Sequence, residues 1–311
     1  MRKITLPNGL CVSSIVLGAM NFGTTTSKAE AYKVLDAYLD FGGNFIDTSN
    51  NYAHWQGTGD ESETLLGEWF KSSGKRERVV LATKVGFDRH GKGAGLKKEQ
   101  IEYWVDQSLK KLSTDYIDLY YAHTDDIKTP LEETLDAFDR LVKKGKVRAL
   151  GASNFDTWRL AEANLLAAAK SRTPYTVAQQ KFTYLHPKFS AAPRYVFNES
   201  VNRERLRFLK EKGLPLVAYS CLCKGGYDDL SRMPQEYEVG GRYETIARFA
   251  KEKGVSVSAA VIAYLLHLHT LENYPEVLPL FSASSKHLAE NMRALDLSIT
   301  KEELNALHDA N

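Results

Sequence analysis

Eight short apolar runs recur along this chain, and longer segments with helical periodicity lie between them. The runs are SSIVLG, NFIDT, VVLATKV, YIDLYYAH, KVRALGAS, YTVAQQ, LPLVAYS and EVLPLFSAS. The intervening segments, such as 28–42, 61–74, 97–113 and 130–146, carry apolar residues near i, i+3, i+4 and i+7. This alternation predicts an α/β fold in which eight parallel strands close into a (β/α)8 TIM barrel with outer helices. An open, doubly wound sheet is the alternative architecture.

Helix-ending glycines agree with this pattern, because they stand just before predicted strands. They are Gly42, Gly43, Gly74, Gly145 and Gly213. At 311 residues the chain has the length of one α/β barrel. We therefore expect residues 1–311 to form a single barrel domain.

Composition excludes several classes of partner. The 41 basic and 39 acidic side chains are interspersed, so no basic stripe predicts nucleic-acid binding. The first residues lack the apolar region of a signal peptide, and no stretch of about 18 apolar residues predicts a membrane span. Three cysteines (Cys11, Cys221 and Cys223) are too few for a disulfide framework or a structural zinc site. We expect a cytoplasmic protein without a metal.

Four ionisable residues stand at or just after the ends of three successive predicted strands. Asp47 ends the second strand, Tyr52 follows it, Lys84 lies near the end of the third, and His123 ends the fourth. In barrels of this kind the carboxyl ends of the strands carry the active site. Each residue alone has a structural interpretation, as a helix cap, an edge charge or a packed ring. Together they predict one catalytic site.

The chemistry that this set predicts is proton donation to a carbonyl oxygen. Tyrosine is a weak acid with a pKa of about 10, and a nearby Lys84 cation is expected to make it useful near neutrality. Asp47 would hold that lysine charged, and His123 would donate a hydrogen bond to the substrate carbonyl. Tyr52 is then the general acid of a carbonyl reduction.

Five stretches, GGNFIDTSNNY, LATKVG, DYIDLYYAH, GKVRALGASNF and AYSCLCKGGY, resemble the aldo-keto reductase family. The likeness runs from IVLGAMNFG to SSKHLAENMRAL, and Asp47, Tyr52, Lys84 and His123 match the family's catalytic tetrad. The resemblance implies a barrel that binds NADPH, with NADH also possible, in extended form across its mouth without a Rossmann fold. It also implies hydride transfer to an aldehyde or ketone.

The same resemblance implies a set of cofactor contacts. Ser153, Asn154 and Gln180 would hold the nicotinamide carboxamide, and Tyr219 would stack on the ring. The complete set is Gly18, Met20, Asp47, Ser153, Asn154, Gln180, Tyr219, Ser220, Leu222, Lys224, Ser284, Lys286, His287 and Asn291.

Ser284 stands where relatives often carry a basic residue that pairs with the adenosine 2′-phosphate. Lys286 and His287 make this stretch positive, and no acidic residue is expected there to select a ribose hydroxyl. We therefore expect NADPH to be preferred, although less strongly than with an arginine at residue 284.

The predicted substrate pocket is largely aromatic. Its walls are Phe22, His54, Trp55 and Phe87, with Met20 and Tyr121 as further candidates. Such walls suit aromatic or sugar-like carbonyls, and core packing is an equal alternative for this set. The polar segment 224–240 is a candidate lid.

Two other functions remain open from the sequence. One is a cofactor-binding redox sensor or regulatory subunit with little turnover, attached to a larger partner. The other is a metal-dependent hydrolase or isomerase, which would need several His, Asp or Glu ligands at strand ends, where only Asp47 and His123 qualify. Physiological substrate, direction of reaction and oligomeric state are not predicted.

Overall fold

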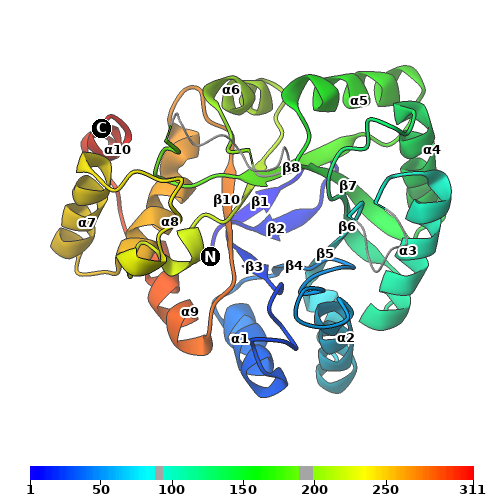
Figure 1. The fold of residues 1–311 in the computed structure, drawn as a ribbon, viewed down its shortest axis with the longest axis horizontal. Helices are drawn as coiled ribbons and strands as arrows, with labels where there is room; N and C mark the ends of the chain where they lie inside the picture. Colours follow the sequence, from blue (N-terminus) through cyan, green and yellow to red (C-terminus); the bar gives the residue numbers. More distant parts are fainter. Residues whose placement is uncertain (88–93, 189–198) are drawn as a thin grey trace.

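The computed structural model describes residues 1–87, 94–188 and 199–311, and its centre is a closed barrel of eight parallel strands. Neighbouring strands follow the order β10-β3-β4-β5-β6-β7-β8-β9, and Figure 1 shows the barrel they form. The strands are β3 (Val16–Gly18), β4 (Phe45–Asp47), β5 (Val80–Val85), β6 (Ile117–Ala122), β7 (Val147–Ser153), β8 (Tyr175–Lys181), β9 (Leu216–Tyr219) and β10 (Val277–Phe281). The predicted barrel is confirmed, and the alternative of an open, doubly wound sheet is wrong.

Helices surround the barrel and cover the outer faces of its strands (Figure 1). They are α1 (Lys28–Asp40), α2 (Glu61–Ser73), α3 (Lys98–Leu112), α4 (Leu131–Lys143), α5 (Thr157–Ala169), α6 (Arg203–Glu211), α7 (Gly241–Lys253), α8 (Val257–His267), α9 (Ser285–Met292) and α10 (Lys301–His308). Gly74 ends α2 with φ 66°, a left-handed conformation that glycine adopts without strain. In the described parts of the chain, none of the helices is long and apolar enough to span a membrane.

Side chains alternate between two packed layers along each strand. One hydrophobic cluster fills the barrel and includes Phe45, Leu119 and Val177, while their sequence neighbours Ile46 and Tyr120 belong to the cluster between strands and helices. Because the period is two residues, a residue two positions beyond an inward side chain also points inward. This rule decides which polar residues reach the mouth.

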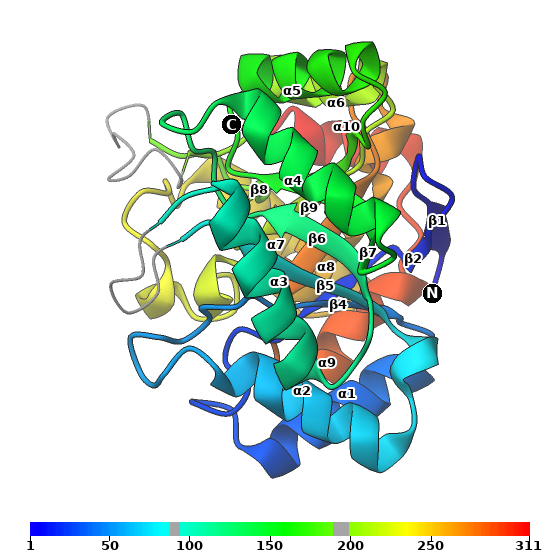
Figure 2. The ribbon, with the colours of Figure 1, turned by 90° about the vertical axis from the view of Figure 1, so that its right-hand side faces the viewer.

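A hairpin that the sequence pattern did not predict closes the other end of the barrel. It consists of β1 (Lys3–Thr5) and β2 (Cys11–Ser13), which pair antiparallel. Ile4, Leu6 and Val12 from this hairpin join the barrel's interior cluster. Figure 2 shows the hairpin at the end of the barrel away from the long loops. The run SSIVLG therefore contributes to two strands, because β2 ends at Ser13 and β3 begins at Val16.

Candidate active site

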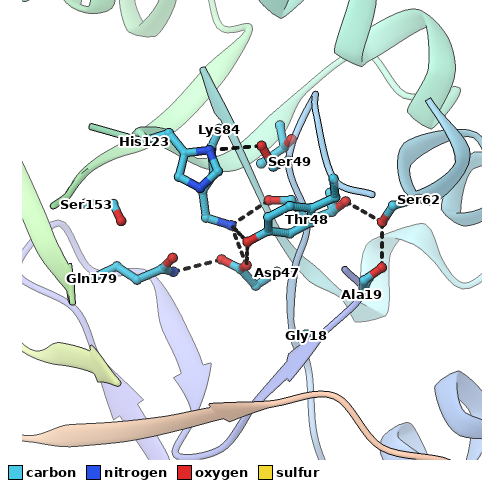
Figure 3. Close-up of polar contacts among 12 residues, drawn as sticks. Gly18, Ala19, Asp47, Thr48, Ser49, Ser62, Lys84, His123, Ser153 and Gln179 are labelled. Carbon is cyan, nitrogen blue, oxygen red and sulfur yellow. Dashed lines mark hydrogen bonds and ion pairs between the residues drawn. The ribbon is translucent and has the colours of Figure 1, made fainter. Parts of the chain in front are cut away.

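Asp47, Lys84 and Tyr52 form one hydrogen-bonded group at the mouth. The Lys84 ammonium donates to Asp47 Oδ1, to the Tyr52 hydroxyl oxygen at 2.6 Å and to the Thr48 carbonyl at 2.7 Å. Asp47 and Lys84 are completely buried, and their ion pair is visible in Figure 3. A buried ammonium has three protons to satisfy, and these three acceptors use all of them. Lys84 is thereby fixed against the tyrosine hydroxyl.

Burial sets the protonation state of Tyr52. It raises the pKa of Tyr52 well above 10, and the negative charge of Asp47 raises it further. The expected lowering of this pKa by Lys84 is therefore wrong, because loss of hydration and the nearby carboxylate outweigh the cation. Burial also lowers the pKa of Lys84, and Asp47 opposes that shift. Tyr52 remains protonated at neutral pH, which is the form that a proton donor needs.

Asp47 accepts hydrogen bonds from three side chains. Besides Lys84, the Tyr52 hydroxyl donates to Oδ1 at 3.1 Å, and the Gln179 amide donates to Oδ2 at 2.9 Å. Figure 3 shows Gln179 reaching Asp47 across the barrel. These donors stabilise a buried carboxylate.

Gln179, and not Gln180, thus occupies the mouth on β8. The Gln180 amide donates instead to the Glu199 carbonyl at 2.7 Å. The expected placement of Gln180 is wrong, because Val177 points into the barrel and the two-residue period carries Gln179 inward with it. The alternation of inward and outward side chains along YTVAQQ identifies Gln179 as the residue that points into the barrel.

His123 lies beside this group, at the end of β6. Its ring contacts Tyr52 and Phe87 edge to face, with centroid distances of 5.8 and 4.6 Å. Nδ1 is 3.1 Å from the Ser49 hydroxyl oxygen, a contact that the sequence pattern did not predict. Burial lowers the pKa of His123 well below 6.5, and the charge of Lys84 lowers it further. The imidazole is therefore neutral near pH 7.

Next along the mouth, Ser153, Asn154 and Tyr219 are linked by hydrogen bonds. The Asn154 amide donates to the His123 carbonyl at 2.8 Å and to Ser153 Oγ at 3.1 Å, and its oxygen accepts from the Tyr219 hydroxyl at 2.7 Å. Through these hydrogen bonds Asn154 connects the ends of β6, β7 and β9. Ser153 accepts this bond through a lone pair, so its own proton can serve another acceptor. With the Gln179 amide, these side chains offer hydrogen-bond donors that a carboxamide oxygen could accept.

The two cofactor candidates on and after β3 differ in exposure. Gly18 is buried, and a Cβ there would lie 2.9 Å from Ser282 Oγ and 3.2 Å from a Leu280 methyl group. Gly18 therefore permits the close approach of β10. Met20 is 37% exposed at the mouth.

The loop after β9 forms a compact turn. It includes the short 3-10 helix η3 (Cys223–Gly225), and Ser220 and Lys224 have φ values of 55° and 58°. Lys224 is exposed and Leu222 is buried. An exposed lysine in such a turn suits a phosphate group.

The predicted adenosine end lies at the N-terminus of α9. Ser284 caps this helix by accepting from the His287 backbone, and its Oγ lies 3.2 Å from His287 Nδ1. Lys286 is exposed, whereas Asn291 is buried.

An acidic residue that the sequence did not place there stands at this end. Glu30 of α1 accepts from the Ser285 backbone N–H at 2.6 Å, and that hydrogen bond lowers the pKa of Glu30. The expectation of a site without an acid is wrong, because helix packing brings Glu30 to α9 from a distant part of the chain.

The residues of the predicted substrate pocket lie in different environments. His54 and Trp55 pack edge to face at 5.1 Å, and Trp55 is 58% exposed. Phe87 lies against His123. Phe22 and Tyr121 do not line the mouth, since Phe22 belongs to the cluster between strands and helices and Tyr121 to the barrel interior. For these two residues core packing is the correct interpretation.

The segment 224–240, a candidate lid, is anchored to the barrel. Tyr227 is completely buried, and its hydroxyl accepts from the Leu185 backbone at 3.0 Å and contacts Thr183 Oγ1 at 2.8 Å. Near the other end Glu236 pairs with Lys181 of β8, and Tyr237 is buried.

In the described residues, no cluster of three His, Cys, Asp or Glu side chains is arranged to hold a metal ion.

Comparison with known proteins agrees with this geometry. The model of the Aldo/keto reductase family matches residues 14–311. The aldo-keto reductase ausK of Emericella nidulans is 32% identical, over 98% of this chain and 80% of that protein. The norsolorinic acid reductase of Aspergillus flavus is 30% identical (99% and 80%), and the aryl-alcohol dehydrogenase [NADP(+)] of Phanerodontia chrysosporium is 28% identical (99% and 85%). The family model covers nearly the whole chain, and the four side chains stand at the mouth of a closed barrel. The chain therefore belongs to the aldo/keto reductase family.

Proposed function

We propose that this chain reduces an aromatic aldehyde or ketone to the alcohol, with a nicotinamide cofactor and with Tyr52 as the proton donor. The observation that carries the proposal is the Tyr52 hydroxyl, which donates to Asp47 and accepts from Lys84. The Phe87 ring against His123, and the exposed Trp55 next to His54 in the loop after β4, support an aromatic substrate. Relatives named as aryl-alcohol dehydrogenase and norsolorinic acid reductase support the same class.

When bound, the cofactor supplies a hydride to the carbonyl carbon. The carbonyl oxygen, which gains negative charge as the C=O double bond opens, takes the proton of the Tyr52 hydroxyl. Lys84 donates to that same phenolic oxygen and so stabilises the phenolate that proton transfer leaves. Asp47 holds Lys84 charged and in place. The products are the alcohol and the oxidised cofactor, and Tyr52 regains its proton from solvent before the next turnover.

We further propose that NADPH is the preferred cofactor and that NADH is also accepted. Lys286 and His287 lie in the first turn of α9, and the helix N-terminus itself favours an anion. Glu30 opposes this, because its carboxylate occupies the Ser285 N–H and repels a phosphate. Together, the positive groups of α9 and the opposing Glu30 carboxylate predict a modest preference for NADPH over NADH. The name of the Phanerodontia chrysosporium relative, an NADP(+) enzyme, agrees with it.

Ser284→Arg is expected to tighten NADPH about tenfold relative to NADH, because a guanidinium can pair with the 2′-phosphate through two charge-assisted hydrogen bonds. Equilibrium titration with each cofactor, followed by protein fluorescence, measures the ratio. Glu30→Gln in the same background removes a carboxylate that can capture the new arginine, and should increase the ratio further. An unchanged ratio in both variants would show that the 2′-phosphate binds elsewhere.

The function itself is tested by the initial rate of NADPH and, separately, NADH oxidation with aromatic aldehydes, diketones and keto-sugars. Turnover with aromatic carbonyls that disappears in Tyr52→Phe supports the proposal. Cofactor binding without turnover on any of these substrates would contradict it and favour a redox sensor.

A further inference from the structure

Two threonines stand directly beside the catalytic ion pair, one next to each of its members. Thr48 follows Asp47 at the end of β4, and Thr83 precedes Lys84 on β5. Because side chains alternate along a strand and the ion pair points inward, both threonines are turned toward the outer helices. Both are completely buried. Their hydroxyls therefore need hydrogen-bond partners behind the barrel wall.

The first turn of α2 supplies both partners. Thr48 Oγ1 lies 2.6 Å from Ser62 Oγ. Thr83 Oγ1 donates to Glu63 Oε1, also at 2.6 Å. Ser62 and Glu63 are consecutive residues of the helix and are themselves completely buried. Figure 3 shows the link from Thr48 to Ser62 beside the ion pair. One helix turn thus contacts both catalytic strands from behind.

The direction of the Ser62 hydrogen bonds follows from counting protons. Ser62 donates its single proton to the Ala19 carbonyl at 2.8 Å, because a carbonyl can only accept. Thr48 must then be the donor in its contact with Ser62. The Ala19 backbone N–H in turn donates to the Asp47 carbonyl at 2.8 Å. Ser62 therefore joins the ends of β3 and β4.

Glu63 is held in place by a second helix. Lys111 of α3 donates to Glu63 Oε2 at 3.1 Å, so each carboxylate oxygen has a partner. Lys111 also pairs with Asp60 at 2.6 Å. The charge of Glu63 raises the pKa of Lys84, against the lowering that burial causes. Glu63 is thus fixed against Thr83 and adds negative charge behind the catalytic lysine.

These outer contacts bear directly on the position of Lys84. Its ammonium donates to the Thr48 carbonyl as well as to Asp47 and Tyr52. A shift of Thr48 would displace one of these three acceptors, and a shift of Thr83 would displace the lysine itself. A misplacement of about 1 Å can slow an enzymatic reaction by about a hundredfold.

We propose that Ser62 and Glu63 are positioning residues that act through Thr48 and Thr83 to hold Lys84 against the Tyr52 hydroxyl. The proposal rests on the proposed carbonyl reduction, in which the lysine stabilises the phenolate that proton transfer leaves. Both positioning residues lie on the helix side of the barrel wall and act on the reaction only through the strands.

Thr48→Val and Thr83→Val test the two links separately, because valine keeps the shape of threonine and lacks its hydroxyl. Each variant is expected to lower the single-turnover rate of NADPH oxidation with an aromatic aldehyde by about tenfold. NADPH affinity, measured by fluorescence titration, should stay as in the wild type. Thr48→Ser and Thr83→Ser keep the hydroxyl and should keep the rate.

Thr176→Val is the matched control. Thr176 is also a buried strand threonine, and its hydroxyl donates to the Leu150 carbonyl at 3.1 Å near the start of β8. This variant should lose a similar amount of stability and react at the normal rate. Ser62→Ala breaks the Thr48 link from the helix side and should slow the reaction as Thr48→Val does. It decides the question if the valine variant does not fold.

Nitrogen-15 NMR of the lysine-labelled protein tests the same positioning without cofactor or substrate. The buried, fully hydrogen-bonded Lys84 ammonium should exchange its protons slowly and give a signal that Lys84→Met removes. We expect this signal to shift or exchange faster in Thr48→Val and Thr83→Val. The two serine variants and Thr176→Val should leave it as in the wild type.

A wild-type rate and an unchanged Lys84 signal in the folded valine variants would overturn the proposal. A rate that falls equally in Thr176→Val would indicate a general loss of stability and would also overturn it, as would a Lys84 signal that exchanges as fast as those of exposed lysines. Failure of the wild-type chain to reduce carbonyls would refute the proposed function. The NMR comparison would still decide whether the helix turn positions Lys84.

Discussion

Tyr52→Phe is expected to lower kcat for carbonyl reduction by about a hundredfold or more, because removal of a general acid typically costs 10²–10⁴ in rate. NADPH affinity should be nearly unchanged, since the hydroxyl acts on the substrate in the transition state and not on the cofactor. Steady-state kinetics measure the rate, and fluorescence titration measures the affinity. Loss of cofactor binding in this variant would contradict the assigned role.

Tyr184→Phe is a suitable control for this experiment. The Tyr184 hydroxyl is buried and donates to the Leu307 carbonyl at 2.9 Å, so its removal also deletes one buried hydrogen bond. We expect a stability loss of about 1 kcal/mol and a normal rate.

The wild-type rate should also show no loss from Tyr52 ionisation up to about pH 9, since burial keeps the pKa of Tyr52 above 10.

Lys84→Met is expected to damage both catalysis and stability. Reduction should slow by about a hundredfold, since the group that stabilises the Tyr52 phenolate is lost. The free energy of unfolding should fall by about 3–5 kcal/mol, because Asp47 remains as an uncompensated charge in a completely buried site. Urea unfolding followed by fluorescence, together with kcat, checks both. A normal rate at neutral pH would remove Lys84 from the mechanism.

The double variant Asp47→Asn, Lys84→Met separates the two effects. It removes both charges, and the amide that replaces the carboxylate can still accept a hydrogen bond through its oxygen. Much of the lost stability should return, because replacing a whole buried ion pair costs far less than breaking it. The rate should stay low. Recovery of the rate together with stability would mean that Lys84 acts through folding alone.

The sequence by itself determined the barrel and three of its mouth residues. Strand and helix periods are local properties, readable within about ten residues, and eight strand–helix units predict closure. Because Asp47, Lys84 and His123 lie two positions beyond inward apolar residues of their own strands, the period also predicts their direction. The same rule distinguishes Gln179, two positions beyond the inward Val177, from Gln180.

Only the tertiary structure decided which distant groups meet. Glu30 reaches Ser285 across 255 positions, and Ser49 reaches His123 across 74, contacts that depend on how α1 packs on α9 and how the loop after β4 folds back. Burial in the closed barrel, and not the mere presence of Lys84, sets the high pKa of Tyr52. The physical reason is the same in each case: periodicity fixes the side of an element on which a residue lies, whereas long-range packing and desolvation fix what that residue touches and which proton it keeps.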